Sequence, residues 1–430
     1  MSDTGYRFFV GIDRGSARHD CFVLDGNGES VKHQTVAHSA TAILPFAEWL
    51  AKLADGNVCD VAIATEDPHG AIIEALLDRG FHLFAINPKQ LDRFRDRHSM
   101  AGAKDDRRDA FVLADSLRTD LKLYRRLEPS EPLVLALREL SRLNKELTVE
   151  FISQSNRLRE QLHRYHSTLL SLCSAADEPW LWELLTKAPT PAGGARLRLA
   201  WLTQMLKRYR IRRFSAEELQ KVLREQPLPV ASGIVEAVSE HVTLLLPRLQ
   251  LLDTQRRLVR QRLSAVLQQL NVPSHEEISE SAAPSQRRSD VDVLSSAPGI
   301  GILVLSAILG EAAEAIKRRD YQGLRSYGGL APVTKQSGKY RHVLMRHGCN
   351  IRLRNAFHYM ANAAMQKDEF WRDIYTHLRA RGQGHSRALR TIADRLLRRL
   401  MAMLETGSLY DGDLAQHTAN KRQQASAMAT

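Results

Sequence analysis

The sequence contains few cysteines, and its four lie far apart, at Cys21, Cys59, Cys173 and Cys349. None of them forms a CxxC pair, which argues against a zinc site or a disulfide framework. No window reaches 18 uncharged apolar residues, and the opening MSDTGYRFFVGIDRG lacks the basic start and apolar core of a signal peptide. We therefore expect a soluble cytoplasmic protein without a membrane partner.

Acidic residues are also fewer than basic residues. The 430 residues carry 61 Lys and Arg against 49 Asp and Glu, a formal net charge of +12, and only 6% are aromatic. An excess of positive charge favours a polyanionic partner, most often a nucleic acid, although it also serves solubility. The length is too great for one hydrophobic core and predicts two or three domains.

The first part of the chain alternates short apolar runs with helical patterns. Expected strands cover residues 7–12, 20–25, 31–36, 58–66 and 81–87, and expected helices cover 40–54 and 70–80. This order predicts an α/β domain with a mixed sheet.

Two long helical patterns follow, at 131–173 and 234–270, and they predict a coiled-coil pair. The pairing can lie within one chain or join two subunits. No role is evident for the segment between them, 174–233. The expected division is 1–125, the α/β domain; 126–273, a helical oligomerisation region with an insertion; 274–290, a linker; 291–408, a mostly α-helical domain; and 409–430, a flexible tail.

Four acidic residues follow or begin expected elements in the first part of the chain. Asp13 closes the first strand, Glu66 closes the fourth, and Asp106 and Asp109 share one face of a helix starting near residue 105. Gathered together they would hold Mg²⁺, which prefers oxygen ligands. Each also has a simpler explanation, as a turn residue, a helix cap or a favourable charge at a helix N-terminus.

In the C-terminal part, SSAPGIGILVLSAILGEA places Gly299 and Gly301 between two helical segments. A tight turn of this kind exposes N–H groups that suit a DNA phosphate, as in a helix-hairpin-helix element, although any interhelical turn can use it.

The stretch 321–367 contains no Asp or Glu, which predicts salt-dependent binding of DNA or RNA phosphates. Ser337 lies within it, in KQSGK, and by residue type alone would be an ordinary loop serine. Cations could stabilise the transition state if its hydroxyl attacked a phosphate. The candidate nucleic-acid contacts are Lys335, Lys339, Arg341, Arg346, Arg352 and Arg354.

These motifs resemble a known family. The GID strand, the later strand ending in Glu66 and the segment KDDRRDA resemble the catalytic domain of DEDD transposases of the insertion-sequence class, whose RuvC-like domain has the ribonuclease H-like fold. GLAPVTKQSGKYRHVLMRHGCNIRLR is similar to their C-terminal serine domain. The resemblance covers about 7–120 and 291–404. The sequence departs from the family after Glu66, with EDPHG in place of the common E-x-T-G.

The resemblance implies a DNA transposase that uses Mg²⁺ on Asp13, Glu66, Asp106 and Asp109, with Ser337 as the nucleophile that links to DNA. It also implies guidance by a structured RNA from the element. Because Asp13 and Ser337 are far apart in sequence, two domains must meet, in one chain or between the subunits of a homo-oligomer. Two alternatives remain: a metal-dependent, structure-selective endonuclease that uses water, and a non-catalytic nucleic-acid-binding protein.

Overall fold

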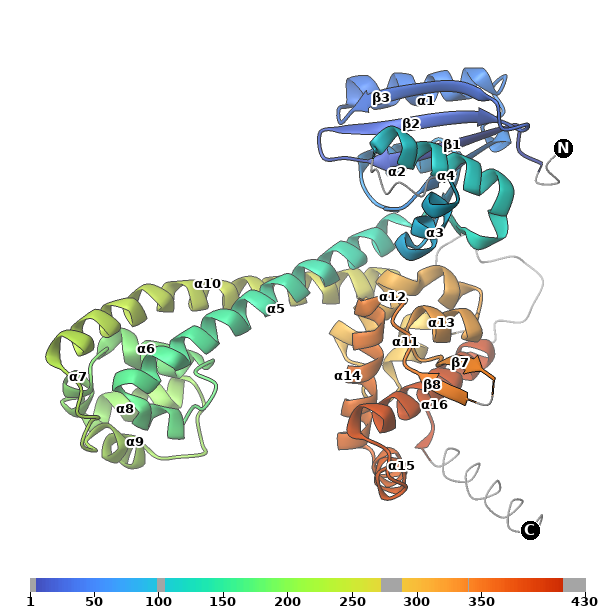
Figure 1. Ribbon diagram of the computed structural model, residues 1–430. Coiled ribbons are helices and arrows are strands. Elements are labelled where there is room, and N and C mark those ends of the chain that lie inside the picture. Colours follow the sequence, from blue (N-terminus) through green and yellow to red (C-terminus); the bar gives the residue numbers. More distant parts are fainter. Residues whose placement is uncertain (1–4, 99–104, 272–287, 339, 413–430) are drawn as a thin grey trace, which may run out of the picture. The chain divides into compact units, whose positions relative to one another are not determined.

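The chain forms two compact units, Met1–Glu131 and Pro132–Thr430 (Figure 1). The structure is a computed structural model that describes residues 5–98, 105–271, 288–338 and 340–412. Among these described residues, no helix is both long enough and apolar enough to cross a membrane.

A six-stranded mixed sheet forms the centre of the first unit, in the order β3-β2-β1-β4-β5-β6. Strands β1, β2 and β3 pair antiparallel, β4 and β5 continue the sheet parallel to β1, and β6 is antiparallel to β5. The expected mixed α/β architecture is therefore confirmed. The strands are β1 (Phe8–Arg14), β2 (Arg18–Asp25), β3 (Ser30–Ala37), β4 (Val61–Thr65), β5 (His82–Ala85) and β6 (Arg125–Leu127).

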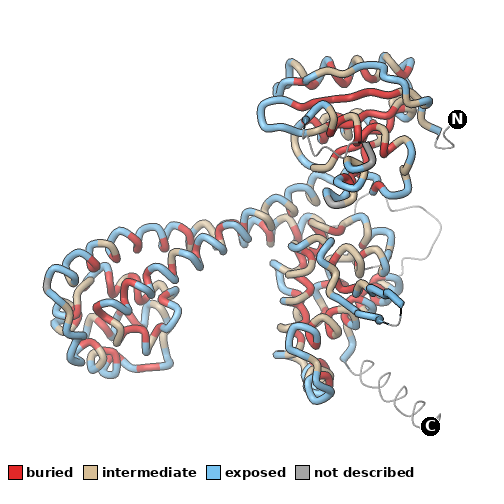
Figure 2. Tube along the Cα trace, in the orientation of Figure 1, coloured by how far each residue is buried: buried red, intermediate tan, exposed pale blue. Residues whose placement is uncertain are grey.

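Helices cover both faces of this sheet, because side chains alternate between the two faces along each strand. Val10 of β1 packs in the core beneath α1 (Ala40–Leu53) and α2 (Ala71–Asp78), whereas its neighbour Phe9 packs beneath α4 (Asp106–Asp120). Figure 2 shows the central strands as buried. The sheet is thus the middle of three layers.

Gly11 sets how closely α4 approaches β1. A Cβ at this position would lie 1.9 Å from the Ala110 carbonyl oxygen and 2.6 Å from the Ala114 nitrogen. No real side chain fits such a space, so the helix backbone packs directly on the strand. The first turn of α4 is thereby brought to the end of β1.

Two elements of the first unit were not expected from the sequence. Helix α3 (Pro88–His98) is rich in charged residues and packs against the core through Leu91 and Phe94, and β6 is only three residues long. Since β6 pairs with β5, the expected domain boundary after residue 125 falls within a strand, and the compact unit extends to Glu131.

The second unit contains two long antiparallel helices, α5 (Pro132–Tyr165) and α10 (Ser232–Leu270), that pack against each other. The helix expected over 131–173 therefore ends earlier, and a short 3-10 turn, Ser167–Ser171, follows it. The segment 174–233 folds into a small helical cluster around Trp180 and Trp182, which are almost fully buried. Its helices are α6 (Pro179–Lys187), α7 (Pro191–Ala195), α8 (Leu199–Arg208) and α9 (Ala216–Leu223).

The last part of the second unit is mostly α-helical, as expected, and carries one exposed β-hairpin. Its helices are α11 (Asp290–Ser295), α12 (Ile302–Lys317), α13 (Tyr321–Tyr327), α14 (Ile351–Lys367), α15 (Glu369–Ala380) and α16 (His385–Thr406). The hairpin consists of β7 (Val333–Ser337) and β8 (Tyr340–Leu344), drawn in pale blue in Figure 2.

Buried polar contacts join the long helix α5 to these C-terminal helices. The Arg138 Nε donates to the Gly310 carbonyl oxygen at 2.7 Å, where α12 departs from helical geometry at Ala312. The Arg142 guanidinium pairs at 3.0 Å with Glu311, whose side chain is 5% exposed. Burial alone would raise the pKa of Glu311, but hydrogen bonds from Arg142 and Asn350 outweigh it and lower the pKa. The N-terminal part of α5 is therefore fixed to α12 and, through Glu311 and Asn350, to the start of α14.

The ends of the C-terminal region differ from the expected boundaries. Most of the expected linker, 274–290, lies outside the described residues, and its last residue, Asp290, begins α11. The expected flexible tail starts at 409, yet Tyr410 packs against the domain: its backbone N–H donates to Ser296 and its hydroxyl donates to Asp368. Residues 413–430 lie outside the described part of the chain.

We expect Gly11→Ala to destabilise the first unit by about 2 kcal/mol, because the added methyl group forces α4 away from β1. Urea unfolding followed by circular dichroism measures the change. Gly26→Ala is the matched control, since a Cβ there would have no neighbour closer than 3.8 Å. Equal unfolding midpoints for the two variants would show that α4 does not depend on this contact.

Candidate active site

The neighbouring parallel strands β1 and β4 end at the same edge of the sheet, and an acidic residue lies at the end of each strand. Asp13 lies near the end of β1, and Glu66 directly follows β4. The strands are in register up to the pair Ile12 and Thr65, so both acids come one residue later. Asp13 also lies two residues beyond Gly11, on the face that α4 covers.

Helix α4 contributes the other two acids from its first turn. Asp106 and Asp109 both lie there, and the Asp109 side chain is only 4% exposed. Asp105, which the sequence analysis left outside the acidic set, is the N-cap: its carboxylate accepts from the Arg107 N–H at 3.3 Å. Asp105 therefore stabilises the helix start, whereas Asp106 and Asp109 act electrostatically on Asp13 at the end of β1.

The four acids influence one another electrostatically. Burial, together with the carboxylates of Asp109, Asp106 and Glu66, raises the pKa of Asp13 to about 6, and Arg95 partly opposes this rise. Like charges at short range disfavour ionisation unless a cation compensates them. The structure thus brings together the four acids that the sequence analysis selected.

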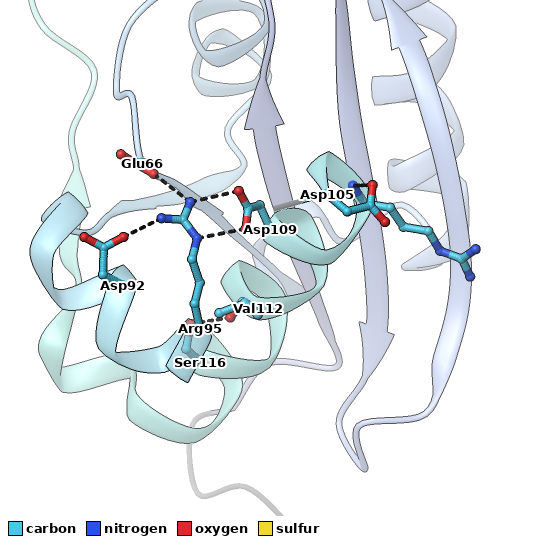
Figure 3. A network of polar contacts seen from close by, with 8 residues as sticks. Glu66, Asp92, Arg95, Asp105, Asp109, Val112 and Ser116 are labelled. Carbon is cyan, nitrogen blue, oxygen red and sulfur yellow. Dashed lines mark hydrogen bonds and ion pairs between the residues drawn. The ribbon is translucent and has the colours of Figure 1, made fainter. Parts of the chain in front are cut away.

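Arg95 of α3 lies between two of these acids, Asp109 and Glu66 (Figure 3). Its Nε and Nη2 donate to the two Asp109 carboxylate oxygens at 2.8 and 3.0 Å, and Nη2 also donates to Glu66 at 3.3 Å. Its Nη1 donates to Asp92 at 2.7 Å. Sequence reasoning missed Arg95, because α3 gave no periodic signal that would have placed it beside the acids.

The four acids offer the oxygen ligands that a hard divalent cation prefers. All four acids are described, yet no three of them have ligand oxygens within 4.8 Å of one another. Among the described residues, that condition is met elsewhere, by Cys173, Asp177 and Glu178. Glu178 is already engaged there by Arg213 and by the Trp180 indole N–H. That group also includes a thiol, whereas the acids at the sheet edge are all oxygen donors and are therefore the better candidates for a hard cation.

The departure from the family pattern after Glu66 has a local structural role. Asp67 forms an ion pair with Arg14, the last residue of β1. The Thr65 hydroxyl also donates to the Asp67 carbonyl at 3.0 Å. This part of the EDPHG loop is therefore tied to the strand end that carries Asp13, and the acid at Glu66 keeps its place.

Ser337 lies in the other compact unit, at the tip of the β7–β8 hairpin, and is exposed. Register places Lys335 opposite His342 and Ser337 opposite Tyr340, so these four share one face of the hairpin. Arg341 pairs with Gln336 and projects from the other face. Lys339 lies outside the described residues.

The remaining expected nucleic-acid contacts lie on different parts of the same unit. Arg352 is exposed in the first turn of α14. Arg346 and Arg354 are half-buried; the Arg346 Nε donates to the Ala331 carbonyl at 3.4 Å, and the Arg354 Nη1 contacts the Cys349 sulfur at 3.9 Å.

The two glycines of the α11–α12 turn differ from each other. Gly299 has a φ of +86° and packs against α14, where a Cβ would lie 2.2 Å from the Met360 carbonyl oxygen. Its role in the structure is therefore close packing. Gly301 is the N-cap of α12 and has open space around it. Gly301 therefore leaves space free beside the start of α12.

Comparison with known proteins gives two family matches in the expected order. Residues 10–167 match the DEDD transposase domain of IS110-type elements, and residues 291–376 match the transposase IS116/IS110/IS902 family.

Individual relatives agree with these matches. The chain is 44% identical over 209 residues to a putative transposase, y4uE, of Sinorhizobium fredii, covering 48% of this chain and 58% of that protein. It is 30% identical over 422 residues to the mini-circle putative transposase for IS117 of Streptomyces coelicolor, covering 96% of this chain and 97% of that protein. The chain therefore belongs to the IS116/IS110/IS902 family of transposases, which are enzymes that cleave and recombine DNA.

Proposed function

We propose that this transposase performs Mg²⁺-dependent DNA strand exchange with Ser337 as the nucleophile, guided by a structured RNA. The observation that carries the proposal is the convergence of Asp13, Glu66, Asp106 and Asp109 from three elements, with the pKa of Asp13 raised to about 6. Four carboxylates with a single arginine among them are an excess of negative charge, which is suited to a divalent cation.

The fold supports this reading of the acids. Three antiparallel strands followed by two strands parallel to β1, in the order β3-β2-β1-β4-β5, are the arrangement of a ribonuclease H-like domain. We assign the first unit to that fold and the turn between α11 and α12 to a helix-hairpin-helix-like element. In this assignment the carboxyl ends of β1 and β4 form the catalytic edge.

In the proposed reaction, the Ser337 hydroxyl oxygen forms a bond to a DNA phosphorus while the bond to the departing DNA oxygen breaks. The serine proton leaves to solvent, and the departing oxygen gains one. Bound Mg²⁺ would supply charge stabilisation for the phosphate in this exchange. Attack by a DNA hydroxyl on the phosphoserine reverses the step and rejoins strands without ATP. The acids and Ser337 must meet at one phosphate, within one chain or between two.

Positive charge on the C-terminal helices supports contact with a nucleic-acid backbone. Burial lowers the pKa of Arg390 on α16, and the neighbouring Arg354 and Arg387 lower it further. Three arginines gathered in this way favour an anionic partner. The transposase family implies DNA as the substrate, and the acid-free stretch 321–367 offers additional surface for a guide RNA.

Exposed leucines on α10 support assembly of two or more copies. Leu244, Leu251 and Leu258 recur every seven residues and are 64%, 58% and 56% exposed. A seven-residue apolar repeat on the outside of a helix pair is typical of a coiled-coil seam. We propose that the same stripe of a second copy covers it, which makes the protein a homo-oligomer.

For the metal site, we expect Asp106→Asn to reduce DNA cleavage at least a hundredfold and to weaken Mn²⁺ binding, because one ligand charge is lost. Cleavage of labelled element ends and calorimetric Mn²⁺ titration are the measurements. Asp105→Asn is the matched control, because it removes the same charge from the adjacent residue and Asn still caps the helix. Equal effects of the two substitutions would contradict the assignment of Asp106.

For the nucleophile, we expect Ser337→Ala to abolish a covalent protein–DNA adduct that survives denaturation, because no other group would replace its oxygen. Gel electrophoresis of end-labelled DNA after denaturation detects the adduct. Thr334→Ala, an exposed hydroxyl on the other face of β7, should leave it intact. Persistent cleavage without any adduct in Ser337→Ala would instead support the endonuclease that uses water.

For assembly, we expect Leu251→Glu to lower the oligomeric state, because a charge in the middle of the apolar seam cannot be buried without a large desolvation penalty. Analytical ultracentrifugation measures the mass. Gln250→Glu adds the same charge at an adjacent exposed position about a quarter turn away and should leave the mass unchanged. A wild-type chain that sediments as a monomer at all concentrations would end this proposal.

A further inference from the structure

We propose that Arg95 is a built-in counter-cation of the acidic site, which holds the carboxylates in the metal-free protein and is displaced when a divalent metal binds. The inference rests on the proposed metal site and adds to it a residue that competes with the ion. It concerns the contacts of Arg95 with Asp109, Glu66 and Asp92.

The contacts with Asp109 are the strongest argument. Arg95 uses both carboxylate oxygens of Asp109, at 2.8 and 3.0 Å, in the paired geometry that guanidinium and carboxylate groups favour. The Asp109 side chain is 4% exposed, so little water can screen its charge. Arg95 is therefore the group that compensates this buried carboxylate in the absence of a metal.

Glu66 ties the same guanidinium to a second proposed ligand. The Arg95 Nη2 reaches its carboxylate at 3.3 Å. One side chain thus bridges the end of β4 and the first turn of α4, which is the space between two of the acids (Figure 3). The guanidinium lies where a shared cation would have to bind.

Arg95 and a metal cannot hold Asp109 in this way together. An Mg²⁺ ligand oxygen lies about 2.0–2.1 Å from the ion. With the guanidinium nitrogens about 3 Å from both Asp109 oxygens, an ion bound there would lie within a few ångströms of a second positive group, and the two would repel. Binding of the ion to Asp109 therefore requires Arg95 to withdraw.

Asp92 provides a partner for Arg95 after it withdraws. It lies three residues earlier on α3, its carboxylate is 64% exposed, and it accepts from the Arg95 Nη1 at 2.7 Å. Arg95 can therefore release Asp109 and Glu66 and keep one ion pair at the solvent-facing side of α3. The exchange needs only side-chain rotation.

The test measures metal binding by the full chain, with Mn²⁺ alone as the probe and free Mn²⁺ followed by electron paramagnetic resonance. We expect Arg95→Gln to bind Mn²⁺ about tenfold more tightly than the wild type, because the ion no longer competes with a guanidinium. Arg93→Gln is the matched control: it removes the same charge from an exposed position on α3, and its affinity should equal that of the wild type.

Thermal unfolding provides a second readout. Metal-free Arg95→Gln should melt at a lower temperature than the wild type, because the acids lose their counter-cation, and saturating Mn²⁺ should close most of the gap. If the metal-free Gln variant does not fold, Arg95→Lys keeps the charge but loses the paired geometry, and it should bind Mn²⁺ more tightly than the wild type by a smaller factor.

Two results would overturn the inference, and they are distinguishable. Unchanged or weaker Mn²⁺ binding by Arg95→Gln, while Asp106→Asn still loses binding, would mean that the metal site is real but that Arg95 does not compete for it. Equal Mn²⁺ binding by the wild type and Asp106→Asn would overturn the proposed metal site and this inference with it.

Discussion

The direct packing of α4 on β1 at Gly11 is the contact on which the acidic site depends. With only a hydrogen at this position, the helix backbone approaches so closely that a Cβ would overlap Ala110 and Ala114. Two residues further along the strand is Asp13, and at the start of the same helix are Asp106 and Asp109. A bulkier residue in the strand would move the helix away and separate the acids proposed to share one ion.

Four carboxylates that lie close together repel one another, and in the metal-free protein other groups of the chain must offset this repulsion. Burial and mutual repulsion raise the pKa of Asp13, and Arg95 supplies opposing charge to Asp109 and Glu66. A cationic side chain in such a position stabilises the empty site and at the same time weakens metal binding. Stability of the metal-free protein and affinity for the ion are therefore opposed through one residue of α3.

The second unit contains helices that are held together by polar contacts and a β-hairpin that is exposed. Arg138, Arg142 and Glu311 fix the long helix α5 to α12, and Asn350 extends this network to the start of α14. The β7–β8 hairpin between α13 and α14 is exposed along nearly its whole length and presents Ser337 at its tip. An exposed hairpin of this kind suits the nucleophilic role proposed for Ser337, whose hydroxyl would have to reach a DNA phosphate.

The sequence alone determined much of this architecture, because the relevant signals are local. Apolar runs predicted β1 to β5, periodicity predicted α1, α2, α5 and α10, and the family motifs selected the four acids and Ser337. It did not reveal α3 or β6, which are polar or very short, nor that α5 stops at Tyr165. Asp105 lies where a helix N-terminus favours an acid, and it is the N-cap of α4.

Only tertiary structure decided which groups meet. Arg95 is remote from Glu66 in sequence and carries no motif, and its place among the acids follows from how α3 packs beside α4. The register of β7 with β8 likewise decided that Lys335 shares a face with Ser337 and that Arg341 does not. Packing of α14 against the α11–α12 turn decided that Gly299 closely approaches the α14 backbone while Gly301 stays open. The type of a residue, which the sequence gives, determines the chemistry of its side chain. The partners of that side chain depend on long-range packing and strand register, which only the tertiary structure decides.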